Sequence, residues 1–169
     1  MTMKLSKLSL VLASAGLTVI SSNSLAQAGA STATLPVNVT VVTNCTITAT
    51  AVTFANYDPL ASTNDDTNSG GVSVACTKGL TAWIGLNFGQ NASASPRAMK
   101  NSSGALLNYD LYKDSPGGTV WGNTSTTGLT LPAAPSKAAR NYTVYGRIFS
   151  GQDVAAAAYS DSVTATVNF

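Results

Sequence analysis

The amino-acid sequence predicts an all-β protein, a sandwich of the Greek-key, immunoglobulin-like class. Short runs of β-branched and aromatic residues recur at regular spacing, and clusters of Gly, Pro, Asn and Asp separate them. No segment shows a convincing helical period, and the alanines at 155–158 are too few to nucleate a helix. The length of 169 residues predicts one domain.

The first 28 residues have the features of a signal peptide. Lys4 and Lys7 give a charged start, residues 8–20 are apolar, and Ala26-Gln27-Ala28 is a small-x-small cleavage site. The apolar stretch contains Ser, Thr and Gly and is too short to span a bilayer comfortably, which argues against a transmembrane anchor. We therefore expect residues 1–28 to direct export.

The charge of the mature chain excludes some partners. Removing the signal takes away two of nine basic residues, and the remaining seven equal the seven acidic residues, all of them Asp. A formally neutral chain has no excess positive charge with which to bind nucleic acid or an anionic membrane. A net charge near zero also removes a barrier to self-association.

Within the stretch from 33 to 45, residues 33–41 alternate strictly between apolar and polar positions. β-Branched residues dominate it, which favours a strand with one apolar face. No tight turn precedes it, so nothing local folds its first half into a hairpin. Such a strand must pair with an acceptor in its own domain or in another chain. Its apolar positions are Ala33, Leu35, Val37, Val39 and Val41.

Four strands are expected before residue 90. Residues 46–50 continue the first strand, and residues 52–54 start another before a turn rich in Asn, Asp and Pro. Residues 62–71 are polar and are expected to form a loop. Alternation over 72–76 directs Cys76 inward, and residues 81–88 carry the next apolar face.

The second half predicts four more strands, separated by loops and turns. Residues 89–99 and 150–158 are expected loops, 114–118 a turn, and 125–140 an irregular crossing between the sheets. Because the last strand reaches the final residue, we expect that an open edge beside it can be closed within the chain only by the N-terminal arm. The four predicted strands cover 106–112, 120–121, 142–149 and 159–169, and the last has Val163, Ala165, Val167 and Phe169 on one face.

The two cysteines, Cys45 and Cys76, are expected to form a disulfide because the chain is exported. Closing this loop stabilises the fold by about 3–4 kcal/mol. A metal or redox role is the alternative, but the sequence has neither His nor a C-x-x-C motif. We therefore interpret the two cysteines as a structural disulfide.

Catalytic and metal-binding motifs are weak. The absence of His excludes Ser–His and Cys–His nucleophile systems. Asp65-Asp66 is the best candidate carboxylate pair, but it lies in a predicted loop. The oxygens of residues 64–68 could bind Ca²⁺, although their spacing is not that of an EF-hand. We therefore expect no enzymatic activity, no cofactor and no bound metal. Asp161 is expected to have a structural role and to form an ion pair with Arg147 or Arg97.

A group of aromatic residues allows a sugar-binding interpretation, because sugars stack on aromatic rings. Core packing is the competing interpretation. Tyr109 and Tyr112 fall on opposite faces of one predicted strand, so at least one is expected to be exposed. The group comprises Tyr109, Tyr112, Trp121, Tyr142 and Tyr145.

Several separated motifs, in this order, resemble the spore coat protein U domain family. That family includes the pilins of archaic chaperone–usher systems, which build biofilm-forming pili in Gram-negative bacteria. One departure is Ala55, where the family often has Gly after the Phe. The motifs are Cys45, Phe54 with Tyr57 and Pro59, Cys76 with Gly79, Arg97 with Met99, L-x-Y-D-L-Y at 107–112, Trp121-Gly122, Y-T-V-Y-G-R at 142–147 and Y-x-D-x-V-T-x-T-V at 159–167.

The resemblance implies an incomplete immunoglobulin-like sandwich that is completed by donor-strand exchange. A periplasmic chaperone would lend a strand during export, and at the outer-membrane usher the arm of a neighbouring pilin subunit would replace it. Residues 29–40 would then form the donor arm and residues 41–169 the pilin domain. The implied donor residues are Ala33, Leu35, Val37 and Val39, and the implied acceptor wall is Val163, Ala165, Val167 and Phe169.

The expected function is therefore that of a structural subunit of a surface pilus, serving adhesion and biofilm formation, with no nucleic-acid or small-molecule partner. Two alternatives remain open at this point. One is a coat protein of a spore or cyst with the same fold. The other is a secreted carbohydrate-binding module with a complete sandwich of its own.

Overall fold

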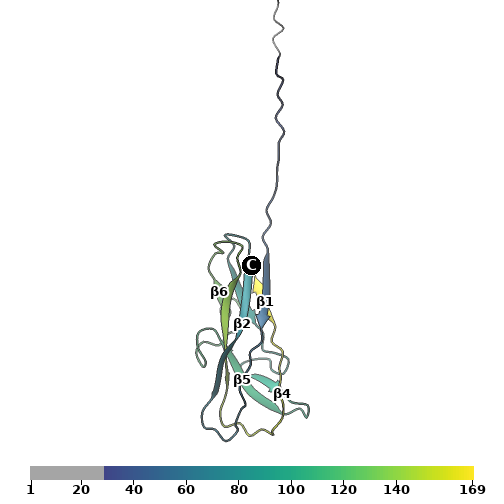
Figure 1. Cartoon of the computed structure of the whole chain (residues 1–169). Helices are drawn as coiled ribbons and strands as arrows, with labels where there is room; N and C mark the ends of the chain where they lie inside the picture. Colours follow the sequence, from purple (N-terminus) through teal and green to yellow (C-terminus); the bar gives the residue numbers. More distant parts are fainter. Residues whose placement is uncertain (1–28) are drawn as a thin grey trace, which may run out of the picture. The chain divides into compact units, whose positions relative to one another are not determined.

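The computed structural model describes residues 29–169, and the predicted signal peptide lies outside them. Residues 40–169 form one compact unit made of antiparallel strands, which confirms the all-β prediction (Figure 1). No helix in the described residues is long and apolar enough to cross a membrane. The strands are β1 (Cys45–Thr50), β2 (Asp65–Cys76), β3 (Ala82–Leu86), β4 (Arg97–Lys100), β5 (Leu106–Tyr112), β6 (Leu129–Leu131), β7 (Arg140–Ile148) and β8 (Ala165–Asn168).

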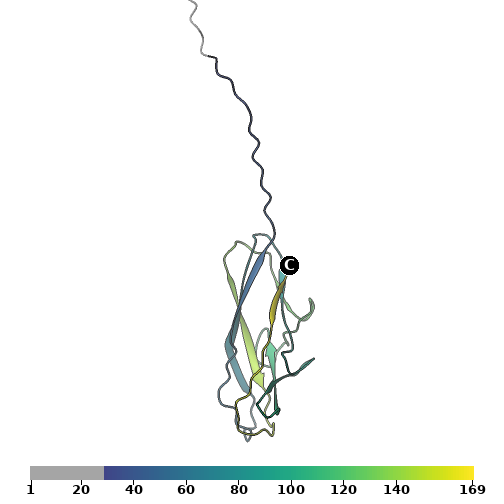
Figure 2. The ribbon, with the colours of Figure 1, turned by 90° about the vertical axis from the view of Figure 1, so that its right-hand side faces the viewer.

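The strands form two sheets. The larger sheet has the order β1-β2-β7-β5-β4, and the smaller one has the order β6-β3-β8. Strands β1 and β8 are therefore both edge strands, and they belong to opposite layers (Figure 2). The C-terminus lies beside the start of β1, so these two edges run in opposite directions.

The core lies between the inward faces of the two sheets. Its apolar side chains alternate along each strand, as a half-buried sheet requires. Trp121 is fully buried and donates a hydrogen bond from Nε1 to the carbonyl of Ile84 at 2.8 Å. The central members are Val72, Val74, Ile84, Leu86, Leu107, Leu111, Leu131, Val144 and Ile148.

Two predicted loops contain strands. Strand β2 begins at Asp65, inside the polar stretch 62–71, and pairs with β7 across a bulge between Thr67 and Gly70. Strand β4 begins at Arg97, inside the predicted loop 89–99, and pairs with β5. Strand β6 lies within the predicted crossing 125–140. Their polar or short sequences lack the alternation that marks a strand.

Four predicted strands are shorter than expected or absent. Residues 33–44 and 52–54 carry no strand, and at 120–121 there is only an isolated bridge from Val120 to Tyr112. The last strand starts at Ala165 instead of residue 159. Upstream of it, Ser160 forms a bridge with Lys100 next to the larger sheet, so the chain crosses between sheets before β8 begins.

Candidate functional site

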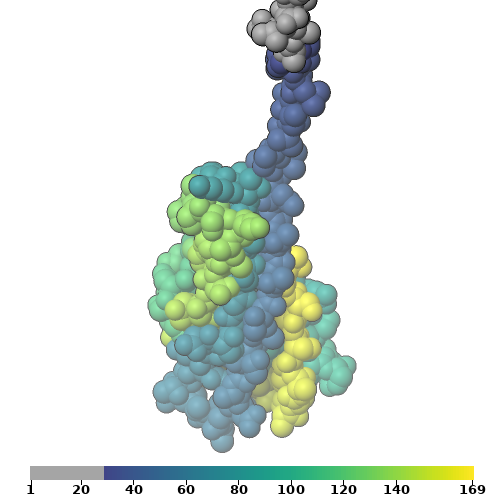
Figure 3. Space-filling model, turned by 45° about the horizontal axis from the view of Figure 1, so that its top comes forward, coloured from purple at the N-terminus to yellow at the C-terminus, as the bar shows by residue number. Residues whose placement is uncertain are grey.

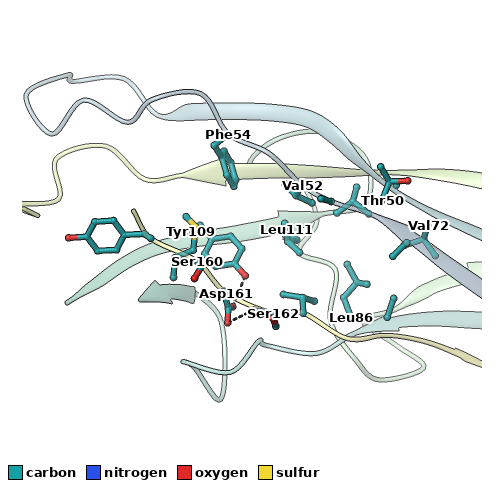
Figure 4. A pocket seen from close by; sticks show the side chains of 18 residues that line it. Thr50, Val52, Phe54, Val72, Leu86, Tyr109, Leu111, Ser160, Asp161 and Ser162 are labelled. Atoms are coloured by element: carbon teal, nitrogen blue, oxygen red, sulfur yellow. Dashed lines mark hydrogen bonds between the residues drawn. The ribbon is translucent and has the colours of Figure 1, made fainter. Parts of the chain in front are cut away.

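An open groove follows the segment after β1 and the chain that leads into β8. In Figure 3 the blue and yellow segments that border it lie side by side on one face. The groove consists of two adjoining hollows of about 490 and 590 Å³, which share Val52, Phe54, Met99 and Tyr159. The first hollow is also lined by Ala49, Thr50, Val72, Leu86, Tyr109, Leu111, Val144, Asp161, Val163 and Ala165 (Figure 4), and the second by Tyr57, Leu107, Ile148 and the residues from Val154 to Ala158.

Two glycines make room for one wall of the groove. A Cβ on Gly70 would lie 2.3 Å from Val52 Cγ2, and a Cβ on Gly146 would lie 2.6 Å from Phe54 Cζ. Val52 and Phe54 can therefore lie close against β2 and β7. Phe54 also packs edge-on against Tyr109, with ring centroids 6.3 Å apart.

The backbone of this wall is held by side chains instead of a strand ladder. The N–H of Thr53 donates to Ser69 Oγ at 2.7 Å, and the carbonyl of Thr53 accepts from Thr67 Oγ1 at 2.9 Å. These bonds fasten the segment at the bulge in β2. No strand is assigned to residues 52–54.

The floor of the first hollow contains a polar cluster around Asp161. Its carboxylate accepts a hydrogen bond from Tyr109 Oη at 2.7 Å (Figure 4). It also accepts hydrogen bonds from Asn91 Nδ2 at 3.0 Å and from the N–H of Gln90 at 2.9 Å. Burial, and then the hydrogen bond to Asp161, raise the pKa of Tyr109 far above its ordinary value. The cluster therefore keeps a neutral phenol and a fully bonded carboxylate among lining side chains that are otherwise mostly apolar.

The prediction that Asp161 pairs with Arg147 or Arg97 is wrong, because both arginines have other partners. Arg97 is buried and forms an ion pair with the buried Asp110. Arg147 binds Asp66 through two nitrogens, and this hydrogen bond lowers the pKa of the Asp66 carboxyl.

Arg97 connects the two sheets. Its Nη2 donates to the carbonyls of Leu86 at 3.2 Å and Trp121 at 2.7 Å, and its Nε donates to the carbonyl of Asn87 at 2.9 Å. Because β4 belongs to one sheet and Leu86 ends β3 in the other, these bonds fix the spacing between the layers next to the first hollow.

The outer edge of β8 offers main-chain groups to a further strand. Ala165 stands opposite Leu86 and Val167 opposite Ile84, while the N–H of Asn87 donates to the carbonyl of Thr164. In an antiparallel pair hydrogen-bonded positions alternate, so the N–H and C=O of Ala165 and Val167 point away from β3. Within the described residues no strand pairs with that edge.

The residues implied as the acceptor wall lie at or near this edge. Val163 and Ala165 line the first hollow. Val167 packs against the core from the same strand, and Phe169 is 58% exposed. The sequence interpretation missed the opposite side of the groove, where Val52 and Phe54 were assigned to an ordinary strand.

The implied donor residues are highly accessible. Leu35, Val37 and Val39 are 84%, 87% and 89% exposed, and Ala33 is exposed as well. No strand is assigned to residues 29–44. Nearly all of the apolar surface of these side chains is thus available for burial.

The disulfide expected between Cys45 and Cys76 is present. It connects the first residue of β1 to the last residue of β2, which stand opposite each other in the sheet. The predicted inward direction of Cys76 agrees with its 3% exposure.

The other candidate chemistry finds little support in the described part of the chain. No group of three or more potential metal-ligating side chains occurs there. Burial and the neighbouring Asp66 raise the pKa of Asp65, while Asp66 is engaged by Arg147. Tyr109, Tyr112 and Trp121 are all buried, so the expectation of an exposed tyrosine in 106–112 is wrong, and these rings form no sugar-stacking face.

Comparison with known proteins gives consistent similarities. Residues 31–166 match the Spore Coat Protein U domain. The chain is 34% identical over 164 residues to "Protein U" of Myxococcus xanthus, covering 85% of this chain and 88% of that protein.

Two solved structures are also similar. One is the CsuC-CsuE complex between a chaperone and a tip adhesion subunit, a pre-assembly complex from archaic chaperone-usher Csu pili of Acinetobacter baumannii, with a TM-score of 0.55 and 27% identity. That match covers 77% of this chain but only 41% of the other. The other is the E. coli Hda pilus minor tip subunit HdaB, with a TM-score of 0.38 and 15% identity, covering 72% of this chain and 79% of that one. From the domain match and the relative of similar length, the chain belongs to the Spore Coat Protein U domain family.

Proposed function

We propose that this protein is a structural subunit of a surface pilus that is assembled by a chaperone–usher pathway and serves adhesion and biofilm formation. The observation that carries the proposal is a pair of matching features in one chain. An apolar groove lies beside the unpaired edge of β8, and an exposed, alternating arm precedes β1. The similarity to a subunit solved together with its chaperone supports it.

In this function the arm of one subunit fills the groove of the next. Ala33, Leu35, Val37 and Val39 enter the groove, and the strand pairs with the open edge of β8 between Val163 and Phe169. Each large apolar side chain buried contributes about 1.5–3 kcal/mol. Each main-chain hydrogen bond adds about 0.5–1.5 kcal/mol net. A head-to-tail contact that does not close on itself produces a filament.

The partners follow from the same edge. Before assembly, an edge strand with an apolar groove beside it is an aggregation hazard that has to be covered. A periplasmic chaperone lends a strand to this edge, and exchange for the arm of the next subunit takes place at an outer-membrane usher. The finished filament lies at the cell surface. This role requires no catalytic group, cofactor or small-molecule substrate.

The test uses the full mature chain with Leu35, Val37 and Val39 all replaced by Asn, hereafter the arm-substituted chain. A synthetic peptide of residues 31–43 serves as the arm. We expect the arm-substituted chain to lose self-assembly while its intact groove binds the peptide. Normal polymerisation of the arm-substituted chain, measured by light scattering and electron microscopy, would show that the arm is not the donor.

A second function, a coat protein layered on a spore or cyst, is favoured by the description of the matching family, the Spore Coat Protein U domain. Electron microscopy of cells with and without the gene separates the two functions. Filaments that disappear with the gene support the pilus subunit, and loss of a continuous surface layer supports the coat protein.

A further inference from the structure

The chain entering β1 is held at the end of β2 by Thr77. The N–H of Asn44 donates to Thr77 Oγ1 at 3.0 Å, and Thr77 Oγ1 donates a shared hydrogen bond to the carbonyls of Val42 and Asn44, each at 3.3 Å. The N–H of Thr77 also donates to the carbonyl of Asn44 at 2.9 Å. We call these three residues the Thr77 clamp. Since the adjacent Cys45 is fixed by the disulfide, the chain from residue 42 to residue 45 is held at the end of β2.

The clamp limits where an arm could turn back toward the groove of its own molecule. With residues 42–44 held, the tightest reversal is a two-residue turn at Thr40-Val41, which places Val39 opposite Val42. Counting back, Leu35 falls opposite Thr46 and Ala33 opposite Thr48. The β1 side of the first hollow begins only at Ala49. The donor side chains would therefore stop short of the groove.

Without the clamp the reversal could occur at Thr43-Asn44, directly before the disulfide. Val37 would then fall opposite Thr50, and Leu35 opposite Val52, both of which line the first hollow. The two registers differ by six residues along β1, which is about 20 Å at the rise of an extended strand. The hydrogen bonds of the Thr77 clamp thus hold the arm in a register that misses the groove and prevent the register that would fill it.

We propose that the Thr77 clamp prevents the subunit from filling its own groove, and that Thr77 is the positioning residue that reserves the arm for another copy of the chain. This inference rests on the proposed function. It adds that donation between molecules is enforced by the path of the chain into β1, so an isolated subunit keeps both its arm and its groove available.

The experiment examines the full mature chain as a monomer, refolded at high dilution and isolated by size exclusion. Hydrogen exchange read by mass spectrometry measures protection of the arm amides. One variant carries a six-residue Gly/Ser insertion between Val41 and Val42, which restores the missing reach. Another variant is Thr77→Val, which keeps the shape of the side chain and removes the hydrogen bonds that the hydroxyl accepts and donates. Thr43→Val is the matched control, because Thr43 is exposed and its hydroxyl forms no hydrogen bond in the described residues.

We expect arm amides in the wild-type and Thr43→Val monomers to exchange as fast as in an unstructured peptide. In the insertion variant they should exchange on the order of 100-fold more slowly, because the arm now lies in a sheet. The same insertion in the arm-substituted chain should give no protection. Thr77→Val should give a measurable protected fraction.

Protected arm amides in the wild-type monomer would overturn the proposal, as would an insertion variant that stays unprotected. If the arm amides of Thr77→Val exchange as fast as those of Thr43→Val, Thr77 is not the residue that positions the arm. Binding of the peptide of residues 31–43 to the arm-substituted chain separates the two levels of inference. If the peptide binds and the wild-type arm is protected, only the clamp is wrong. If the peptide does not bind, the proposed function fails.

Discussion

Shortening single side chains of the arm should weaken its binding in a strictly alternating pattern. Leu35 and Val37 are 84% and 87% exposed in the subunit, so nearly their whole apolar surface is removed from water if they enter the groove. Val37→Ala deletes two methyl-sized groups, about 1.6 kcal/mol at about 0.8 kcal/mol each. That energy corresponds to a loss of about 14-fold in affinity. Leu35→Ala deletes three groups and should cost about 2.4 kcal/mol, or about 50-fold.

Asn38 provides the control, because it lies between two donor residues and faces away from the groove in the same strand. Asn38→Ala should change the affinity by less than about 0.5 kcal/mol, a factor of about two. The assay is titration of peptides of residues 31–43, carrying one change each, into the arm-substituted chain. Equal losses at Asn38 and Val37 would refute the alternating burial on which the magnitudes depend.

Three further predictions concern the stability of the fold. Replacing both cysteines by Ser should lower the free energy of unfolding by about 3.7 kcal/mol, the loop-closure value for a separation of 31 residues, as measured by urea denaturation. Arg97→Met should cost about 3–5 kcal/mol because it leaves the buried carboxylate of Asp110 unpaired. Arg147→Met removes a pair whose side chains are 24% and 38% exposed and should cost at most about 1 kcal/mol; equal losses in the two variants would contradict this assignment. Because the pKa of Tyr109 is raised in the folded state, the neutral phenol contributes fully to the free energy of unfolding below the ordinary pKa of 10.0, and this contribution is lost as the pH rises beyond that value. Between about pH 8 and pH 11, the free energy of unfolding from denaturation curves should therefore fall less for Tyr109→Phe than for the wild type.

The sequence predicts the fold class and the strands with an alternating apolar face. The strands at 72–76, 106–112 and 142–149 carry clear alternation, and β2, β5 and β7 contain nearly all of these residues. The family resemblance also comes from these regions. The sequence signal is thus strong where a strand has one face in the core and the other in water.

The prediction of strands from the sequence fails where a strand carries polar side chains at positions that are usually apolar. Strand β4 begins with Arg97, which would mark a loop were it not paired with Asp110 in the core. The first part of β2 is polar because Asp66 binds Arg147 across the sheet, and the site of a side chain at Gly70 is occupied by Val52. Such partners are distant in sequence and have no local signature.

The candidate site shows the same division. One wall of the groove, including Val163 and Ala165, could be predicted from alternation and the family resemblance. The opposite wall could not, because Val52 and Phe54 are positioned by glycines on β2 and β7 and by side-chain hydrogen bonds. The turn of Asp161 toward Tyr109 and Asn91 likewise depends on contacts that no periodicity encodes.

The place of the disulfide has a mechanical consequence for a filament joined through the arm. Tension along the fibre would first reach each subunit at residues 42–44, which the Thr77 clamp holds just before β1, and β1 is an edge strand with one neighbour in the sheet. Pulled from that end, an edge strand peels away one hydrogen-bonded pair at a time. Once the Thr77 clamp has opened, the covalent link between Cys45 and Cys76 lies at the first pair of β1, so the load passes directly to β2 in the interior of the sheet. A reducing agent should therefore weaken such a fibre under stretching far more than at rest.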